Sequence, residues 1–212
     1  MEKHIGLDFD NTIVKYDEVF HKYGVNIFGM PKRIPQTKTS VKEYFWDYKN
    51  EGGWEHWVEL QGIVYGEKML EAKPSPGLEK FLEHCQRNAI RVSISSHKTE
   101  FPKRGTQVNL WDSAWQWLEE NLFSIRRNFK ICKSDIFFEP ERSLKILRIK
   151  NLGCTVFVDD LIEVFNDPTF PEHVKKILYD PHNQKCHEKT DVISCKSWEK
   201  ISFNINNLYI LN

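Results

Sequence analysis

The sequence predicts an α/β fold in which a parallel sheet carries helices on both faces. Short apolar runs that are typical of buried strands alternate with segments in which apolar residues recur at helical spacing. Two of the apolar runs end in acids. Asp8 and Asp10 lie at the end of the run at 3–9, and Asp159 and Asp160 directly follow the run at 155–158. Parallel sheets bind ligands at the carboxyl ends of their strands, so these acids mark a candidate site.

The elements of the predicted core can be assigned in chain order. After the first strand at 3–9, a helix is expected with Ser75 as its N-cap and Pro76 in its first turn, running to about Arg87. A strand at 90–95 ends in serines and is followed by a polar loop. The remaining elements are a helix at 110–121, a strand within 129–138, a helix at 140–150 that stops before Gly153, and strands at 155–158, 176–179 and 191–195.

Residues 15–72 differ in amino-acid composition from the rest of the chain. They are aromatic, charged and poor in aliphatic runs, and prolines and glycines divide them into short pieces. We therefore expect a core made of residues 1–14 and 73–212, with residues 15–72 inserted as a small, mainly helical module.

Composition narrows the classes of function. The 212 residues include 30 basic and 30 acidic side chains, so the chain has no net charge that would attract nucleic acid or a membrane surface. A hydrophobic content of 40% supports a packed core, and no apolar stretch reaches the length of a membrane span. Five cysteines without a CxxC pair favour a reduced, cytoplasmic protein. We expect a monomer or homodimer.

The pair Asp8 and Asp10 carries the first chemical signal. The chain is expected to turn near Asn11, which leaves both carboxylates at the end of the first strand. Two such acids repel each other unless a cation or a proton lies between them. The pattern therefore indicates a functional site rather than a simple turn.

Four segments in a fixed order extend this signal. They are Asp8-Phe9-Asp10-Asn11-Thr12, Ile94-Ser95-Ser96-His97, Arg142-Ser143-Leu144-Lys145 and Val156-Phe157-Val158-Asp159-Asp160. Together they resemble the motifs of the haloacid dehalogenase (HAD) superfamily of phosphohydrolases. The resemblance covers nearly the whole chain apart from residues 15–72. It implies a Rossmann-like, three-layer core and a cap inserted between the first two motifs.

The resemblance also implies roles for these residues. Asp8 would be the nucleophile that becomes an aspartyl-phosphate, and Asp10 the acid that protonates the leaving group and later activates water. Ser96 would bind the phosphoryl oxygens, and Lys145 would neutralise charge beside Asp8. Ser95 competes with Ser96, and Lys150 and Lys98 compete with Lys145. Mg²⁺ would be held by Asp8, the Asp10 carbonyl, Asp159 and Asp160.

Substrate recognition is expected from the first two motifs, the loop after the second motif, and the insert. The candidates are Thr12, Ser96, His97, Lys98, Arg104, Trp54 and Trp57. The cations of the loop would bind a second anion or belong to a solvated surface, and the tryptophans would contact a sugar ring or pack the module. The leading hypothesis is a magnesium-dependent phosphatase for a small phosphate ester, such as a sugar phosphate. A phosphotransferase, or a non-catalytic module that binds a phospholigand or partner, is the alternative.

Overall fold

A computed structural model describes residues 3–47, 52–123, 131–183 and 191–210. The chain divides into two compact units. One, the core unit, comprises Met1–Ile13, Pro74–His97 and Phe129–Asn212; the other, the insert unit, comprises Val14–Lys73 and Lys98–Asn128. The sequence had assigned residues 98–128 to the core, whereas in the structure this segment clusters with the insert.

The core unit contains a six-stranded sheet whose strand pairs are parallel. Its strands are β1 (His4–Leu7), β4 (Arg91–His97), β5 (Ile136–Glu139), β6 (Val156–Asp159), β7 (Lys175–Tyr179) and β8 (Val192–Cys195). They lie in the order β5-β4-β1-β6-β7-β8. This arrangement confirms the predicted α/β fold with a parallel sheet.

The register of the sheet brings three polar strand ends together. Leu7, the last residue of β1, pairs with Ile94 of β4 on one side and Val158 of β6 on the other. Asp8 follows Leu7 and its backbone N–H donates to the Val158 carbonyl at 2.9 Å. The carboxyl ends of β4, β1 and β6 therefore meet at one edge, and the order of the strands changes direction there.

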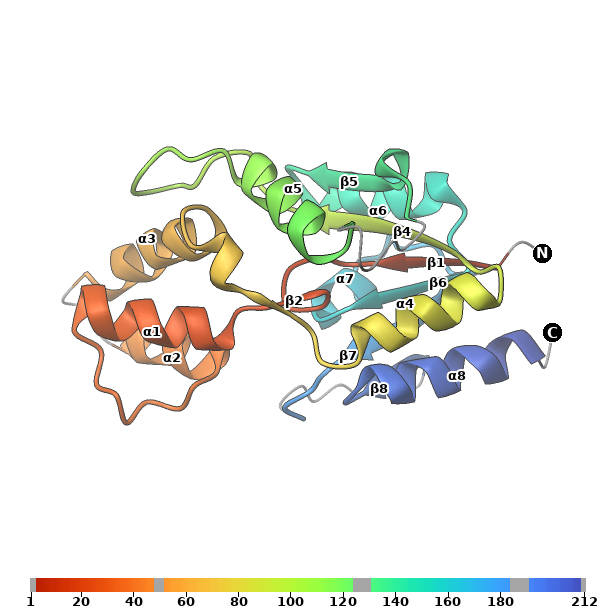
Figure 1. Ribbon diagram of the computed structural model, residues 1–212, viewed down its shortest axis with the longest axis horizontal. Helices are drawn as coiled ribbons and strands as arrows, with labels where there is room; N and C mark the ends of the chain where they lie inside the picture. The colour runs from red at the N-terminus through yellow and green to blue at the C-terminus, as the bar shows by residue number, and fades with distance from the viewer. Residues whose placement is uncertain (1–2, 48–51, 124–130, 184–190, 211–212) are drawn as a thin grey trace. The chain divides into compact units, whose positions relative to one another are not determined.

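Helices cover both faces of this sheet. On one face α4 (Leu78–Arg87) and α8 (Trp198–Ile210) run side by side, and Phe81 and Trp198 bring their ring centroids to 4.8 Å (Figure 1). Trp198 also packs on Tyr179 of β7. The preceding residue, Leu178, points the other way and joins the cluster formed with α6 (Arg142–Leu152) and α7 (Ile162–Phe165). The core is thus a three-layer structure.

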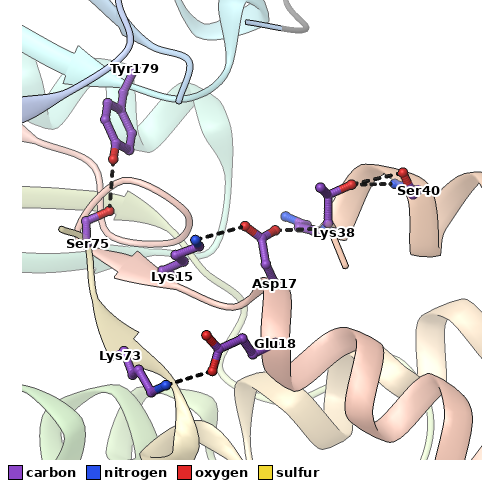
Figure 2. Close-up of polar contacts among 9 residues, drawn as sticks. Lys15, Asp17, Glu18, Lys38, Ser40, Lys73, Ser75 and Tyr179 are labelled. Carbon is purple, nitrogen blue, oxygen red and sulfur yellow. Dashed lines mark hydrogen bonds and ion pairs between the residues drawn. The ribbon is translucent and has the colours of Figure 1, made fainter. Parts of the chain in front are cut away.

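The start of α4 and the end of β4 are among the element boundaries that differ from their predictions. Gly77, with φ of 90°, precedes α4 in the N-cap position that the sequence assigned to Ser75. Only glycine adopts this left-handed conformation without strain, and the Ser75 hydroxyl instead donates to the Tyr179 hydroxyl at 3.3 Å (Figure 2). At the other boundary, β4 extends to His97, two residues beyond the predicted end. Gly153 ends α6 with φ of 67°, as predicted.

The insert unit is mainly helical. It contains α1 (Asp17–Phe28), α2 (Lys38–Asp47), α3 (Gly53–Tyr65), a 3-10 turn η2 (Met69–Glu71) and α5 (Leu110–Asn121). The short strands β2 (Val14–Lys15) and β3 (Lys73–Pro74) pair where the chain enters and leaves the first segment of this unit. Phe20 stacks on Trp57 at 5.1 Å, and the Trp117 indole N–H donates to the Ala72 carbonyl at 2.8 Å. Aromatic side chains therefore form much of its core.

A 3-10 turn, η3 (Lys133–Asp135), precedes β5 in the core unit. The predicted strand within 129–138 begins at Ile136, and residues 129 and 130 lie outside the described part of the chain. Among the described residues, none of the helices is both long and apolar enough to cross a membrane.

Gly6 offers a sharp test of packing in the centre of the sheet. A Cβ at this position would lie 2.5 Å from Phe157 Cδ2 and 2.9 Å from Cys154 Sγ, and both neighbours are fully buried. We expect Gly6→Ala to destabilise the fold by about 1–3 kcal/mol, because an overpacked core cannot relax. Denaturant unfolding measures this loss, and it should be smaller in a Phe157→Val background. An equal loss in both backgrounds would contradict the assigned contact.

Candidate active site

The candidate site lies at the carboxyl edge of the core sheet. Asp8 follows β1, Ser96 lies near the end of β4, and Asp159 ends β6 with Asp160 directly after it. Lys145 comes from α6, the helix that connects β5 to β6. Residues that are up to 152 positions apart in the chain are therefore gathered by three adjacent strands and one helix.

Lys145 forms the centre of the site. Its Nζ donates to Asp8 Oδ1 at 2.6 Å and to Asp159 Oδ2 at 2.7 Å, and its side chain is 1% exposed. It shares the buried face of α6 with Ile149, one turn later. Lys150, the competing lysine on this helix, is exposed. Of the two, the structure brings Lys145 to the acids.

The two adjacent serines of β4 occupy different environments. Successive side chains of a strand point to opposite faces, so only one of the pair can face Asp8. The Ser96 hydroxyl donates to Asp8 Oδ1 at 3.0 Å, whereas Ser95 Oγ is buried and has no hydrogen-bond partner among the described residues. Because both Ser96 and Lys145 bind Oδ1, they fix the orientation of the Asp8 carboxylate.

Three buried carboxylates form a group with the dimensions of a metal site. One oxygen each from Asp8, Asp159 and Asp160 lies within 4.8 Å of the others, and the three side chains are at most 7% exposed. The Leu161 backbone N–H holds Asp159 through its Oδ1 at 2.9 Å. Oxygen ligands at such spacing suit a hard divalent cation.

The buried carboxylates of the cluster need positive charge nearby to remain ionised. Burial raises the pKa of Asp8 above its ordinary value and that of Asp159 to about 6, while the Lys145 ammonium opposes both shifts. Burial lowers the pKa of Lys145, but the carboxylates of Asp159 and Asp8 outweigh this and hold it above its usual range. Ionised acids are therefore costly here, and a cation would relieve that cost.

The turn after β1 positions the rest of the first motif. Asn11 has φ of 62°, and the Ile13 N–H donates to the Phe9 carbonyl at 3.0 Å, which confirms the predicted turn at this point. Asp10 is partly exposed, and its charge contributes to the raised pKa of Asp8. Thr12 is fully buried, and its hydroxyl has no hydrogen-bond partner within the described ranges.

The other predicted substrate-binding residues fall in both units. His97 remains in the core unit, is exposed and donates from Nε2 to the Pro140 carbonyl at 3.1 Å. Lys98 and Arg104 belong to the insert unit, where Lys98 is 4% exposed and Arg104 is exposed. Trp54, in the same unit, is 47% exposed and meets the edge of Trp46 at 5.1 Å.

Trp57 has a different environment from Trp54. Its ring is 3% exposed and stacks on Phe20 inside the insert unit, so it contributes to packing. Sequence reasoning missed the Leu161 N–H and the Pro140 carbonyl as site contacts. Backbone groups are present at almost every residue, so the amino-acid sequence carries no signal for them.

Solved structures that are similar to this chain over nearly its whole length include HAD-superfamily hydrolases and a phosphatase. Among these, a protein from Clostridium acetobutylicum designated a predicted phosphatase has a TM-score of 0.61 at 15% identity, covering 98% of this chain and 99% of that one. A HAD hydrolase from Bacillus subtilis, bound to magnesium and showing interdomain movement, has a TM-score of 0.60 at 12% identity, covering 97% and 99%.

A HAD-superfamily hydrolase from Ehrlichia chaffeensis is similar across the whole length as well. It has a TM-score of 0.52 at 15% identity and covers 99% of each chain. No family model and no curated protein sequence matches this chain. The chain therefore has the fold of HAD-superfamily hydrolases, which confirms the resemblance of the four motifs at the level of the fold.

Proposed function

We propose that this chain is a HAD-superfamily phosphatase that hydrolyses a small phosphorylated metabolite, with Mg²⁺ bound by Asp8, Asp159 and Asp160. The observation that carries the proposal is the convergence on Asp8, where Lys145 Nζ at 2.6 Å and Ser96 Oγ at 3.0 Å both contact Oδ1. The phosphatase designation of the Clostridium protein and the magnesium in the Bacillus hydrolase agree with it.

We propose that the second carboxylate oxygen of Asp8, Oδ2, attacks phosphorus, because Ser96 and Lys145 both bind Oδ1. In the first step Asp8 Oδ2 forms a bond to phosphorus, the bond from phosphorus to the leaving oxygen breaks, and Asp10 gives that oxygen its proton. In the second step water attacks the phosphorus of the aspartyl-phosphate, Asp10 takes the water proton, and the bond to Asp8 breaks. Phosphate and free carboxylate result.

The neighbouring groups lower the electrostatic barrier to this reaction. Lys145 reduces the repulsion between the Asp8 carboxylate and an anionic phosphoryl group, and the Ser96 hydroxyl can turn from Asp8 to a phosphoryl oxygen. Bound Mg²⁺ would supply further charge compensation for the phosphoryl oxygens. The backbone Asp10 carbonyl is the fourth ligand that we propose for it.

We further propose that the insert unit acts as a cap that selects the substrate. Trp54, Lys98 and Arg104 are the side chains we assign to recognition there, together with Thr12 and His97 of the core unit. The exposed ring of Trp54 is available to a sugar or another flat apolar surface. Trp57 instead supports the unit from within.

A panel of phosphorylated metabolites, assayed for phosphate release with and without Mg²⁺, tests the proposed function. We expect turnover of at least one small phosphate ester, dependent on Mg²⁺ and abolished by chelation. Adding alcohols as acceptors distinguishes hydrolysis from phosphoryl transfer, because transfer yields a new ester in place of phosphate. Failure to turn over any member with either water or an added acceptor would overturn the catalytic assignment.

Mg²⁺ should stabilise the protein more at pH 7.5 than at pH 5.0. The folded-state pKa of Asp159 is raised to about 6, above its unfolded value. Between these two pKa values the carboxyl group of Asp159 therefore keeps its proton in the folded state and loses it in the unfolded state. Stability from this group is therefore present at low pH and lost towards pH 6 and above. A metal ion offsets that loss once the acids are ionised.

Thermal unfolding at both pH values, with MgCl₂ or with KCl of equal ionic strength, measures this difference. The gain in Tm from Mg²⁺ should be larger at pH 7.5. Equal gains at the two pH values would show that Mg²⁺ binding does not compete with protons on Asp8 and Asp159.

A further inference from the structure

His97 is the last residue of β4, and one hydrogen bond fixes which of its ring nitrogens carries the proton. Nε2 lies 3.1 Å from the Pro140 carbonyl oxygen, in the loop between β5 and α6. A carbonyl oxygen can only accept, so Nε2 carries the proton and donates it to this bond. In a neutral ring the other nitrogen, Nδ1, is then an acceptor. Among the residues that the structure describes, none donates a hydrogen bond to Nδ1.

The ring of His97 is neutral at pH 7.5. Partial loss of solvent lowers its pKa below the ordinary value of 6.5, and the positive charges of Lys145 and Arg142 lower it further. The Pro140 carbonyl and the Asp10 carboxylate act in the opposite direction without reversing the shift. Nδ1 therefore remains an acceptor at a pH where Asp159, with a pKa of about 6, is ionised.

This acceptor lies beside the acids of the candidate site, within the core unit. Ser96, the residue before it, donates to Asp8 Oδ1 at 3.0 Å, and the charges of Asp10 and Lys145 both act on the His97 ring. The paired strands β4 and β5 end at the same edge of the sheet as β1 (Figure 1). The acceptor is therefore close to the carboxylate that we propose as the nucleophile.

Arg142 brings a positive charge close to the same ring. It is the first residue of α6, two positions after Pro140, whose carbonyl binds His97. One turn further along α6, Lys145 reaches Asp8 at 2.6 Å. The side chain of Arg142 thus begins between the residue that holds the His97 ring and the lysine that contacts the proposed nucleophile.

The guanidinium of Arg142 can donate to a ligand. Its charge is a minor cause of the lowered pKa of Asp167, but Asp167 Oδ1 accepts from the Thr169 N–H at 2.9 Å and from the Thr169 hydroxyl at 2.6 Å. Arg142 is exposed and forms no ion pair within the described ranges. A guanidinium has five N–H donors and no acceptor.

An acceptor next to a guanidinium selects a neutral group that both donates and accepts. A carboxylate would pair with Arg142, but it has no proton to give to His97 Nδ1 and would place negative charge against that lone pair. An ammonium group would donate to Nδ1 and be repelled by Arg142 and Lys145. A hydroxyl satisfies both partners, because its hydrogen goes to Nδ1 while its oxygen accepts from Arg142.

We infer that His97 and Arg142 recognise a hydroxyl group that the substrate carries close to its phosphoryl group. This inference rests on the proposed phosphatase function and narrows the substrate class to phosphate esters of polyols, a class that includes sugars. An ester without the hydroxyl leaves the polar groups of both side chains without this partner. Sites built to bind a hydroxyl discriminate strongly against analogues that lack it.

Phosphonates, which resist hydrolysis, test this recognition without requiring turnover. Calorimetric titration at pH 7.5 with Mg²⁺ present compares alkylphosphonates with their ω-hydroxy, ω-carboxy and ω-amino derivatives over a short range of chain lengths. We expect the hydroxyl to improve affinity by about tenfold or more at one chain length. The carboxylate and the ammonium group should give no gain at that length.

Substitutions at the two exposed side chains separate recognition from folding. His97→Phe should abolish the gain from the hydroxyl, and Arg142→Met should reduce it, while ethylphosphonate binds both variants as it binds the wild type. His97→Asn should retain much of the gain, because the amide oxygen can take the place of Nδ1. His173→Phe and Lys150→Met are the matched controls, at an exposed histidine and an exposed lysine elsewhere in the core unit, and should keep the gain.

The inference is overturned if hydroxyalkylphosphonates bind no more tightly than alkylphosphonates at every length, or if His97→Phe keeps the gain. A gain from the carboxylate that depends on Arg142 alone would also overturn it, by assigning the position to an anion. The proposed function fails separately. A hydroxyl preference without turnover in the metabolite panel would retain the recognition site and contradict the phosphatase assignment, and turnover without such a preference would do the reverse.

Discussion

Asp8→Asn is expected to eliminate phosphate release while leaving the fold intact. The substitution keeps the shape of the side chain and an oxygen that can accept from Lys145 and Ser96, but it removes the anionic oxygen that attacks phosphorus. Loss of a nucleophile that acts with its neighbours as a unit lowers kcat by roughly 10⁴-fold or more. Steady-state turnover of 4-nitrophenyl phosphate with Mg²⁺ measures the loss.

Asp8→Asn should lower activity without lowering thermal stability when no metal is bound. Burial raises the pKa of Asp8, so the ionised carboxylate costs folding free energy at neutral pH when no metal is bound. Without Mg²⁺, the Tm of Asp8→Asn at pH 7.5 should equal or exceed that of the wild type. The sign follows from the raised folded-state pKa: the cost is present above this pKa and disappears as the carboxyl is protonated at low pH.

Trapping the intermediate separates a nucleophile from a metal ligand. Acid quenching during turnover, followed by mass spectrometry, should detect a phosphoryl group on a peptide containing Asp8 in the wild type and not in the variant. Asp112→Asn, at an exposed acid of α5, is the matched control and should retain both turnover and label. A turnover rate in Asp8→Asn close to the wild-type rate would rule out Asp8 as nucleophile.

The core sheet could be predicted because its signals are local. Each strand is a short apolar run, and the acids that follow β1 and β6 are visible without any tertiary information. The final helix, α8, was not predicted. Its buried residues Trp198, Ile201 and Ile205 do recur at helical spacing, but three asparagines and β-branched isoleucines weaken the helix signal. Packing on α4 overrides that weak propensity.

The membership of residues 98–128 in the insert unit could not be read from the sequence. It depends on close approach between the loop after β4 and α3, where Gly62 and Gly66 leave room for Pro102 and Val108. A glycine within a helix indicates that another segment of the chain can pack closely there. The segment that does so lies about 40 residues away, and its sequence has no feature that identifies it as the partner.

The acids of the candidate site were easier to predict than the groups that orient them. Asp8 and Asp159 stand out as charges at the ends of apolar strands, and the structure places both against Lys145. The choice between Ser95 and Ser96 depends on which face of β4 meets Asp8. That face is set by the register with β1, which a single sequence leaves open.

Lys145→Met is expected to cost both activity and stability, and pH should separate the two effects. Its ammonium group touches Asp8 and Asp159, which are 6% and 0% exposed, so its removal leaves two buried carboxylates without this counter-charge. Breaking a buried ion pair in this way costs about 3–5 kcal/mol. Lys150→Met, on the exposed side of the same helix, should change stability by less than about 0.5 kcal/mol.

The loss of stability in Lys145→Met should shrink at low pH. Lys145 opposes the rise in pKa of both carboxylates, so without it their folded-state pKa values should move further upward. Protonation then removes the uncompensated charge, and the difference in Tm from the wild type should narrow between pH 7.5 and pH 5.0. Mg²⁺ should narrow it at pH 7.5 by supplying the missing positive charge.

A double variant distinguishes charge balance from packing as the reason for the loss. Lys145→Met combined with Asp159→Asn removes one charge of each sign, so it should recover much of the stability at pH 7.5 while remaining inactive. If the double variant were as unstable as Lys145→Met alone at every pH, the lysine would act through its packed aliphatic stem. Recovery of the fold without recovery of turnover would instead show that the buried ion pair is retained for chemistry.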